Sequence, residues 1–558
     1  MPHPPGTTDI AAEWMQRGVI DLLGRSLNTG WPPRWQTPET GEWPSGPSSS
    51  IGYYDSQVSH DIKYVWELQR HQYLPAIATK HVELGDSESA SELIDIMLDW
   101  GECHPLHRTV AWMEGIEVSL RLISWFDTIS RLSGLLPTDD PRVADIGTIL
   151  AAHASWLRGH LSRKWRLNNN HLLLELVGLI VAGHALGWHP SAARWRRTGL
   201  TLMAKELQAQ TMAGRNWEPT TAYHRFVTEA ILVARWSWLE WDGERSAKEA
   251  NAIDELEQLV QQHLDTLWLL CDERNRIPLV GDDDAGVVIA RQKGWLAPDS
   301  EHVFSFAAAQ ALLPQQREGA HAWRQCSMGV IKQAGFHVHL VAGAPEGVAR
   351  QASHRHLDFL SCTVTLHGSP VLIDPGTFTY FGSRSWRDSM RRCRVHPTVW
   401  SKKGEFAAQR DLFEMPFPPL GEIEEVYGGL KARCSHPHLG FVERAVILEG
   451  DTLVIRDEGD LAEPCWSFPI PKEAVWQLDE STLVVIGDGW RLEHTPVTGV
   501  VREVRGEMPE GVDLGTILAA DPIDGVTSSG YGRAESGLRL EVEGDWTQQR
   551  TTTIRHVG

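Results

Sequence analysis

One apolar stretch of the chain places His354, His356 and Asp358 at alternate positions. In a β-strand, residues two apart point to the same face, so these three side chains would lie side by side. Burying two imidazoles and a carboxylate is costly unless the groups are paired or bind a ligand. The spacing therefore indicates either a strand whose polar face binds something or an incorrect strand assignment.

A metal site is one interpretation of this stretch. His356, Asp374 and His396 lie in separate predicted elements and together offer two imidazoles and one carboxylate. Such a set suits a tetrahedral zinc ion with one coordination position left for water or another ligand. An ion that takes both His354 and His356 from a single strand is equally compatible with the sequence.

Arginines are concentrated just after this stretch, and they suggest how an anionic ligand would be held. They are Arg384, Arg387, Arg391, Arg392 and Arg394. Because a guanidinium fork matches the geometry of a carboxylate, one interpretation is a cationic wall for substrate carboxylates. The other is a solvated surface loop.

Two more polar clusters each precede a segment with apolar residues at helical spacing. The first consists of Asn168, Asn169, Asn170 and His171, and a helix cap would account for only one of its asparagines. The second contains Asn216, Glu218, Tyr223, His224 and Arg225. For the second cluster, an alternative is that Thr220 or Thr221 caps a helix and Tyr223 packs in the core.

The elements that must position these clusters differ between the two halves of the chain. Residues 55–315 show apolar positions at helical spacing and predict about nine to eleven helices, whereas residues 316–558 show period-two alternation with frequent turns. Within the second half, residues 448–459 and 485–494 predict two hairpins, because Gly and Asp stand where tight turns need them. Residues 1–54 are rich in Pro, Gly and Ser and are expected to be irregular. The fold class is therefore α+β and multidomain, with an all-helical domain before an antiparallel β domain.

Composition limits the classes of partner and environment. The 558 residues carry a net charge of −21, which argues against nucleic acid and anionic membranes as partners. The apolar segment 171–188 contains Glu175 and His184 and predicts a buried helix rather than a membrane span. No secretory signal is seen and the seven cysteines form no CxxC pair, so a reduced, cytoplasmic location is expected, unless an export segment was trimmed. The 25 tryptophans are expected mainly in the core, or in part along a sugar-binding groove.

Several motifs, in order, resemble the heparinase II/III family of polysaccharide lyases. They are DIKYVWELQRHQYL, AWMEGIEVSLRLISW, NNNHLLLE, EPTTAYHRF, PLVGDDDAG and the segment from SHRHLDFLS through GSPVLIDPGTFTY to HPTV. The resemblance covers most of the chain and includes heparinase III-like and oligoalginate lyase-like proteins. It implies an incomplete α/α toroid followed by an antiparallel β-sandwich, and β-elimination on an acidic, uronate-containing polysaccharide or oligosaccharide.

The resemblance also implies roles for individual residues. Asn170 would bind the uronate carboxylate, and His171 would assist it or act as a base. Tyr223 would donate a proton to the leaving O4, and as a phenolate would also serve as base for some sugars, with His354 as the alternative base or carboxylate neutraliser. His356, Asp374 and His396 would hold a structural zinc ion. Substrate contacts are expected from Asn169, Glu218, His224, Arg225, Arg387 and Arg391.

Departures from the family pattern and two other functions qualify this interpretation. Pro397 replaces the usual asparagine, and residues 390–393 read MRRC, so the metal site and the substrate are the least constrained parts. A toroidal glycoside hydrolase would instead use carboxylates among Glu218, Asp282, Asp283 and Asp284. A non-catalytic carbohydrate-binding or exopolysaccharide-assembly protein is the third possibility. Neither the polymer, whether a glycosaminoglycan or alginate, nor the oligomeric state follows from the sequence.

Overall fold

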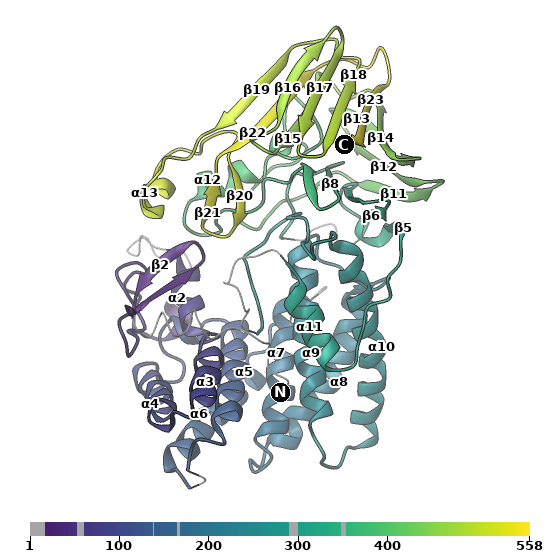
Figure 1. The fold of residues 1–558 in the computed structure, drawn as a ribbon. Helices are drawn as coiled ribbons and strands as arrows, with labels where there is room; N and C mark the ends of the chain where they lie inside the picture. Colours follow the sequence, from purple (N-terminus) through teal and green to yellow (C-terminus); the bar gives the residue numbers. More distant parts are fainter. Residues whose placement is uncertain are drawn as a thin grey trace.

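The computed structural model describes residues 17–52, 61–137, 139–163, 168–289, 299–347 and 353–557. A helical domain forms one half of the molecule and a domain of antiparallel sheets forms the other (Figure 1). The predicted fold class, a helical domain followed by an antiparallel β domain, is confirmed. In the described residues, the last helix of the first domain ends at Ala309 and the first strand of the second begins at Gly319.

Ten α-helices among the described residues build the first domain. They are α2 (Ile62–Gln69), α3 (Leu74–Leu84), α4 (Ser87–Cys103), α5 (Gly115–Leu132), α6 (Pro141–Gly159), α7 (Asn170–Ala185), α8 (Ala192–Gln210), α9 (Thr221–Leu239), α10 (Ala247–Leu270) and α11 (Glu301–Ala309). A short hairpin joins α8 to α9, formed by β3 (Thr211–Met212) and β4 (Arg215–Asn216).

Helix α7 lies at the centre of this domain. It packs against α5, α6, α8 and α9, and its residues from Leu172 to Gly183 are all buried. The prediction of a buried helix is confirmed, and no described helix is long and apolar enough to cross a membrane. Because α7 and α9 both begin near the β domain, their first turns place polar residues at the junction of the two domains (Figure 1).

The expectation that residues 1–54 are irregular is wrong for part of that segment. The chain forms a hairpin from β1 (Val19–Leu22) and β2 (Arg25–Asn28). Its two turn residues, Leu23 and Gly24, both have positive φ, as a tight hairpin turn requires. Ile20, Leu22 and Leu27 are buried against the helices, so this short alternating segment is held by packing.

The β domain is entirely antiparallel within its sheets. Its first sheet has the order β5-β6-β7-β8-β9, the second β11-β12-β13-β14-β23-β18-β17-β16, and the third β10-β15-β22-β19. The two hairpins predicted from Gly and Asp turn signals are confirmed as β13–β14 and β17–β18. The β domain has a hydrophobic core of its own, separate from that of the helical domain. In the helical core, Trp100, Trp125 and Trp238 are among the largest buried side chains, as expected for core tryptophans.

The strand bounds are β5 (Gly319–Trp323), β6 (Met328–Gln333), β7 (Phe336–Val341), β8 (Cys362–Leu366), β9 (Ser369–Leu372), β10 (Val399–Ser401), β11 (Gly421–Val426), β12 (Gly429–His436), β13 (Gly440–Glu449), β14 (Thr452–Gly459), β15 (Pro464–Ile470), β16 (Val475–Asp479), β17 (Thr482–Gly487), β18 (Trp490–Thr495), β19 (Val501–Gly506), β20 (Thr527–Gly530), β21 (Arg533–Glu535), β22 (Gly537–Glu543) and β23 (Arg550–His556). Helices α12 (Arg384–Met390) and α13 (Leu514–Ala519) lie between strands. Short 3₁₀ helices span Ser48–Ser50, Val110–Trp112, Arg324–Cys326 and Cys393–Val395.

The predicted strand through His354, His356 and Asp358 is wrong. Described residues from 353 to 361 form turns and irregular backbone, and strand β8 begins only at Cys362. The alternation therefore does not come from a pleated strand. Both imidazoles instead turn toward one carboxylate from the helical domain, as the site shows.

Candidate active site

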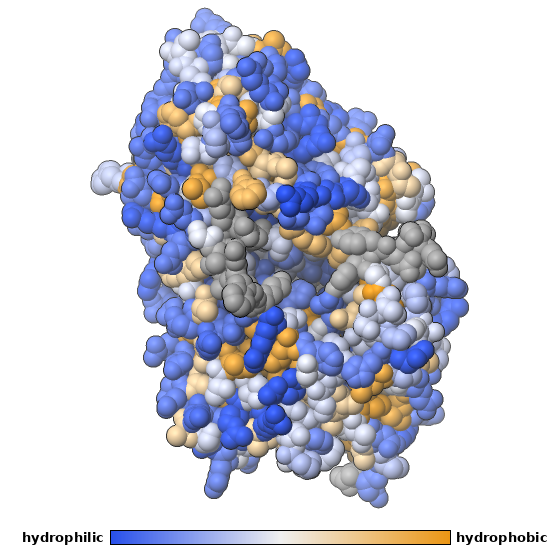
Figure 2. Space-filling view, turned by 180° about the vertical axis from the view of Figure 1, so that it is seen from behind, coloured by the Kyte–Doolittle hydropathy of each residue, from blue (hydrophilic) through white to orange (hydrophobic). Residues whose placement is uncertain are grey.

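A cavity of about 360 Å³ lies where the two domains meet. The molecular surface is mostly hydrophilic, with hydrophobic residues in small scattered groups, and it is hollowed at mid-height (Figure 2). The helical domain contributes Lys63, Trp66, Arg70, Glu114, Ile116, Glu117, Asn169, His171, Tyr223 and Asp284, and the β domain contributes Ser353, His354, Tyr380, Phe381 and Phe413. This is the place where sequence-predicted residues from both halves come together.

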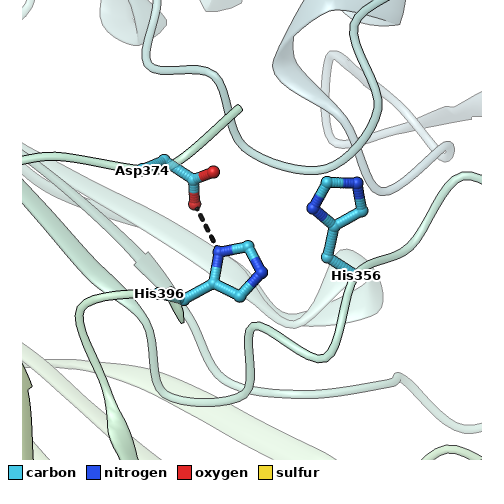
Figure 3. A group of neighbouring side chains, drawn as sticks. All are labelled: His356, Asp374 and His396. Atoms are coloured by element: carbon cyan, nitrogen blue, oxygen red, sulfur yellow. Dashed lines mark hydrogen bonds and ion pairs between the residues drawn. The ribbon is translucent and has the colours of Figure 1, made fainter. Parts of the chain in front are cut away.

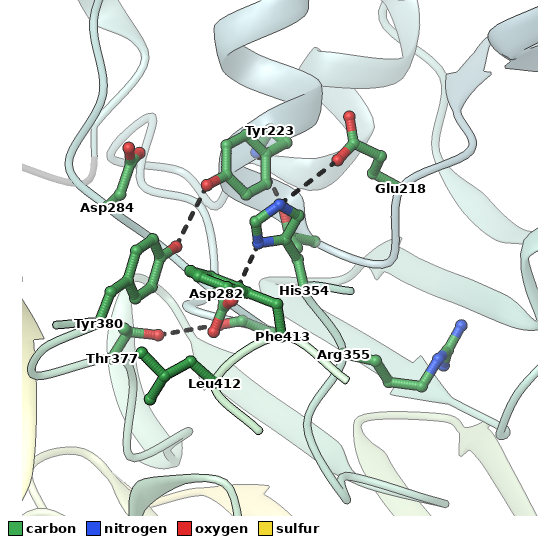
Figure 4. Close-up of polar contacts among 12 residues, drawn as sticks. Glu218, Tyr223, Asp282, Asp284, His354, Arg355, Thr377, Tyr380, Leu412 and Phe413 are labelled. Atoms are coloured by element: carbon green, nitrogen blue, oxygen red, sulfur yellow. Dashed lines mark hydrogen bonds and ion pairs between the residues drawn. The ribbon is translucent and has the colours of Figure 1, made fainter. Parts of the chain in front are cut away.

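Tyr223 is positioned by the start of α9. The Thr220 side chain caps this helix by accepting a hydrogen bond from the Tyr223 backbone N–H at 2.9 Å. The Tyr223 hydroxyl lies 3.2 Å from the Tyr380 hydroxyl, and its ring centroid lies 4.5 Å from that of His354 (Figure 4). Burial, followed by the charges of Asp284 and Asp282, holds the pKa of Tyr223 well above its usual value. The phenol therefore keeps its proton, as a general acid must before it reacts.

His354 faces Tyr223 from the β domain, and its ring is anchored by Asp282. Its Nδ1 lies 3.0 Å from Asp282 Oδ2, and its Nε2 lies 3.9 Å from Glu218 Oε2 (Figure 4). The residue is 8% exposed and lines the cavity. An imidazole that is hydrogen-bonded at Nδ1, and whose Nε2 lies beyond hydrogen-bond distance of Glu218, has the arrangement of a general base.

The asparagine cluster is divided by the first turn of α7. Asn169 and His171 line the cavity, but Asn170 is buried, with its amide nitrogen 3.0 and 3.1 Å from the two Glu218 carboxylate oxygens. Glu218 Oε1 also accepts a hydrogen bond from the Asn170 backbone N–H, so it caps the helix from another segment. Glu218 therefore holds Asn170 in place, and the Asn170 amide is already engaged in this structure.

His171 has a carboxylate beside it. Its Nδ1 lies 3.6 Å from Glu114 Oε2 at the start of α5. Burial lowers the pKa of His171, but the hydrogen bond and charge of Glu114, together with the charges of Glu175 and Glu218, outweigh it, so the net shift is upward. His171 is thus biased toward the cationic form, which suits contact with an anionic substrate better than proton abstraction.

Five predicted substrate contacts do not line the cavity: Glu218, which holds Asn170, and His224, Arg225, Arg387 and Arg391. His224 is fully buried, with Nδ1 accepting from the Asn216 backbone N–H and Nε2 bonded to the His263 carbonyl. Arg225 is 1% exposed and approaches the Gly286 carbonyl and Asp283. These two side chains follow Tyr223 on α9, but they point into the helical core because helix neighbours face different directions.

The predicted cationic wall is also corrected at its two main members. Arg387 forms a buried, two-pronged salt bridge with Asp282, including Nη2–Oδ2 at 2.6 Å. Arg391 is completely buried and donates to the carbonyls of Asp411, Leu412 and Arg355. Both guanidinium groups are buried and bonded within the protein, so neither presents its donors to a substrate.

The cations that do line the cavity are Lys63 and Arg70, which sequence reasoning missed. Lys63 Nζ lies 2.9 Å from Asp284 Oδ2 and 3.4 Å from Glu67 Oε2, and Arg70 makes a fork with Glu117 at 2.7 and 2.8 Å. Burial lowers the pKa of Lys63, but neighbouring carboxylates raise it, and the net shift is upward. The signal was present, because charges at 63, 67 and 70 follow helical spacing in an otherwise apolar helix α2.

Tyr380 was missed as well. It lies in the GTFTYFG segment, its backbone N–H donates to the Tyr531 hydroxyl at 2.9 Å, and the Arg387 guanidinium lies 4.6 Å from its ring centroid. Its hydroxyl therefore meets that of Tyr223 from a rigid position. The family motif contained the residue, but no spacing rule singled it out.

The three predicted metal ligands do come together. His356, Asp374 and His396 are buried, and one possible ligand atom from each lies within 4.8 Å of the others (Figure 3). His356 Nδ1 and His396 Nε2 are buried nitrogens without a hydrogen-bond partner, while His396 Nδ1 lies 2.9 Å from Asp374 Oδ2. Burial lowers the pKa of His356 to about 4, so this imidazole is neutral, as a ligand must be. Two unpartnered imidazole nitrogens beside a carboxylate fit a cation such as zinc.

Similar proteins share the domain order found here. A curated heparin-sulfate lyase of Pedobacter heparinus is 21% identical over 395 residues, which are 63% of this chain but only 55% of that relative's own length. A solved heparan sulfate lyase from Pedobacter heparinus has a TM-score of 0.59 at 17% identity and covers 99% of this chain and 83% of its own. The Streptomyces coelicolor A3 chondroitin AC lyase, solved with chondroitin sulphate, has a TM-score of 0.54 at 11% identity and covers 99% and 78%.

Family models place the two domains together in one family. The heparinase II/III N-terminus model matches residues 35–266, and the heparinase II/III-like C-terminal model matches residues 320–555. The matches follow the observed order of a helical domain and an antiparallel β domain. The chain belongs to the heparinase II/III family.

Proposed function

We propose that this protein is a polysaccharide lyase that cleaves a uronate-containing polysaccharide by β-elimination. The observation that carries the proposal is the meeting of a protonated phenol, Tyr223, with an imidazole, His354, in one cavity lined by the cations Lys63 and Arg70. Elimination needs a base for the C5 proton, an acid for the leaving O4 and positive charge near the uronate carboxylate. All three kinds of group line this cavity.

In the proposed reaction, His354 Nε2 removes the C5 proton and Tyr223 donates its phenolic proton to O4. The C4–O4 bond breaks, a C4=C5 double bond forms, and the two protons end on the imidazole and the new hydroxyl. His171 and Lys63 would stabilise the negative charge that develops on the carboxylate. Asn170 retains its expected role only if the substrate displaces Glu218 from its amide.

Two of the four candidate carboxyl groups, Asp282 and Asp284, are in a state that disfavours a hydrolase. Glycoside hydrolysis needs one carboxyl with a raised pKa to act as the acid. Arg387 and the neighbouring histidines, opposing burial, hold the pKa of Asp282 well below its usual range, and Lys63 and Arg70 help to lower that of Asp284 to about 2 despite burial. Neither group is suited to donate a proton to a glycosidic oxygen.

We further propose zinc at His356, Asp374 and His396. The unpartnered ring nitrogens of the two histidines support it. When bound, the ion would supply structural cross-linking between the loop at 353–361, the segment after β9 and the 3₁₀ helix at Cys393–Val395. The chemistry proposed for the cavity uses His354 and Tyr223 and does not involve this site.

The test is a screen for unsaturated uronate ends by ultraviolet absorbance. Purified protein is incubated with heparan sulfate, heparosan, hyaluronan, chondroitin, alginate and glucuronan, with Tyr223→Phe as the matched control. We expect absorbance to rise with at least one polymer and the variant to be about 100-fold slower or more while folding normally, since only one hydroxyl is lost. New reducing ends without absorbance would indicate the hydrolase, and binding without either product would indicate a carbohydrate-binding protein.

A further inference from the structure

Asp282 connects the proposed base to the proposed metal site. This residue is fully buried in the segment between α10 and α11. Its Oδ2 lies 3.0 Å from His354 Nδ1, its Oδ1 lies 2.9 Å from His356 Nε2, and the Arg387 guanidinium donates to both oxygens. One carboxylate therefore contacts two histidines that stand two positions apart in the chain (Figure 4 shows Asp282 beside His354).

The backbone keeps these partners in register. The Asp282 N–H donates to the His354 carbonyl at 3.0 Å. Gly281 has a φ of +68°, and a Cβ atom there would lie 2.7 Å from the Pro219 carbonyl oxygen and 3.0 Å from that of His354. Only glycine allows this approach without strain, so the segment bearing Asp282 is closely fitted to the loop bearing both histidines.

The hydrogen-bond roles at Asp282 follow from its partners. An ionised carboxylate is an acceptor only, and the guanidinium of Arg387 provides the counter-charge for it. Each histidine must then donate an N–H to Asp282. His354 donates from Nδ1, which leaves the lone pair on Nε2, and His356 donates from Nε2, which leaves the lone pair on Nδ1.

Those two lone pairs lie where the two proposed roles need them. The His354 ring lines the cavity and faces Tyr223, and its Nε2 lies 3.9 Å from Glu218 Oε2, which is too far for a hydrogen bond. His356 Nδ1 is a buried nitrogen without a hydrogen-bond partner, in the group with Asp374 and His396. The same carboxylate thus selects opposite tautomers in two neighbouring histidines and assigns one to the cavity and the other to the metal site.

We propose that Asp282 is a positioning residue that sets the Nδ1–H tautomer of His354 and the Nε2–H tautomer of His356 at the same time. The part that concerns catalysis rests on the proposed lyase function. The tautomers themselves do not depend on it. A consequence is that the proposed base and metal ligand are coupled through one buried carboxylate rather than built independently.

The variant Asp282→Asn tests this coupling. One carboxylate oxygen becomes an NH₂ donor, so the side chain no longer accepts from both imidazoles, and at least one histidine must change tautomer or lose its partner. Asp283→Asn is the matched control, because Asp283 is buried in the same segment and its Oδ1 accepts from the Ala285 backbone N–H rather than from a histidine. Both variants remove one formal negative charge.

The first measurement reads the tautomers directly. Metal-free wild-type protein labelled with ¹⁵N-histidine is studied by nitrogen–proton correlation spectra, and the signals are assigned with His354→Gln and His356→Gln. We expect Nδ1–H at His354 and Nε2–H at His356, unchanged in Asp283→Asn. The opposite tautomer at either histidine of the wild-type protein would overturn the proposal, whether or not Asp282→Asn folds and whether or not the protein is a lyase.

The second measurement separates the two consequences. In Asp282→Asn we expect the zinc content after metal loading to fall at least tenfold, because His356 loses the carboxylate that orients it. We also expect kcat on the polymer identified by the screen to fall about 100-fold or more, with KM changed by no more than about threefold. In a serine protease, the aspartate that holds the histidine tautomer is worth about 10⁴ in kcat. Asp283→Asn should keep both values within about threefold. Normal zinc content and kcat in folded Asp282→Asn would overturn the coupling. Absence of unsaturated product from the wild-type protein would instead reject the proposed function and leave the tautomer and zinc results to decide this inference.

Discussion

The two cations that line the cavity are already paired with carboxylates of the protein itself. Lys63 contacts Asp284 and Glu67, and Arg70 contacts Glu67 and Glu117. A substrate carboxylate must therefore compete with protein carboxylates for these cations. This arrangement pre-organises the cations without leaving them unpaired in the free protein, where a lone buried charge would be costly.

Lys63→Met tests the role of the cavity cation. We expect kcat/KM on the polymer identified by the screen to fall at least about tenfold, because the developing carboxylate charge loses an ammonium group. We also expect the free energy of unfolding to fall by about 3–5 kcal/mol, since Asp284 loses its buried partner. Chemical denaturation and initial rates measure the two effects.

Lys332→Met is the matched control for that variant. Lys332 donates to the carbonyls of Trp268 and Cys271 at 2.8 Å and does not line the cavity. It should lose stability without losing kcat/KM. Equal rates for Lys63→Met and Lys332→Met would show that Lys63 has no part in substrate turnover.

At the scale of elements, helix starts position the chemistry. Helix α9 begins at the Thr220 cap and presents Tyr223 in its first turn, whereas α7 is capped from outside by Glu218. The position of the proposed catalytic acid, Tyr223, therefore depends on the hydrogen bond by which Thr220 caps α9. Capping groups of this kind contribute about 1 kcal/mol each.

Thr220→Ala should reduce stability by about 1 kcal/mol and also lower kcat several-fold, because the first turn of α9 carries Tyr223. Ser246→Ala removes the cap of α10, whose capping box pairs Ser246 with Glu249 outside the cavity. That control should lose similar stability and keep its kcat. Denaturant unfolding and rate measurements compare them, and an unchanged kcat in Thr220→Ala would contradict the positioning role of this cap.

The loop at 353–361 has no regular hydrogen-bonded structure of its own, so the proposed zinc ion is expected to stabilise it. His356→Ala should lower both the bound zinc per chain and the thermal midpoint. His494→Ala is the control, because His494 is also fully buried in the β domain but bonds Thr552. Elemental analysis and thermal melts should show lower stability in both variants and zinc loss only in the first. Normal zinc in His356→Ala would place the metal elsewhere.

At the scale of the whole molecule, buried tyrosines make alkaline pH the destabilising direction. Burial is the first cause that raises the pKa values of Tyr73, Tyr223, Tyr380 and Tyr531 well above the usual range. Below about pH 10, folded and unfolded chains both keep these protons, so the groups cause no pH dependence. Above it, the unfolded chain releases protons that the folded chain retains, and the free energy of unfolding falls.

We expect that loss to approach about 1.4 kcal/mol per pH unit for each such tyrosine above about pH 10. Urea unfolding over a series of alkaline pH values measures the slope. Tyr223→Phe should reduce the slope by about one proton's contribution. A free energy of unfolding that stays level above pH 10 would mean that these hydroxyls are not shielded as the structure indicates.

Features of the fold that depend on interactions between residues close in the chain could be predicted from the sequence, and features that depend on distant residues could not. The helices, the hairpins β13–β14 and β17–β18 and the order of the domains were predictable, because periodicity and turn residues act over a few neighbours. The hairpin β1–β2 was not predicted, because its alternation of apolar and polar residues is short and lies in a segment rich in Pro and Gly. The strand through His354 was wrongly predicted because a period of two also arises when two side chains turn to one partner.

The sequence by itself determined which residue types and elements are present and which family the order of motifs indicates. Only the tertiary structure decided which polar groups meet. From the sequence, Arg387 is interpreted as a substrate-binding arginine, but in the structure it pairs with Asp282, 105 positions away. Lys63 has the pattern of a charge on a helix surface, but in the structure it lines the same cavity as Tyr380. The physical reason is that a buried charge must be paired, and its partner comes from any segment that packs beside it, which local spacing does not encode.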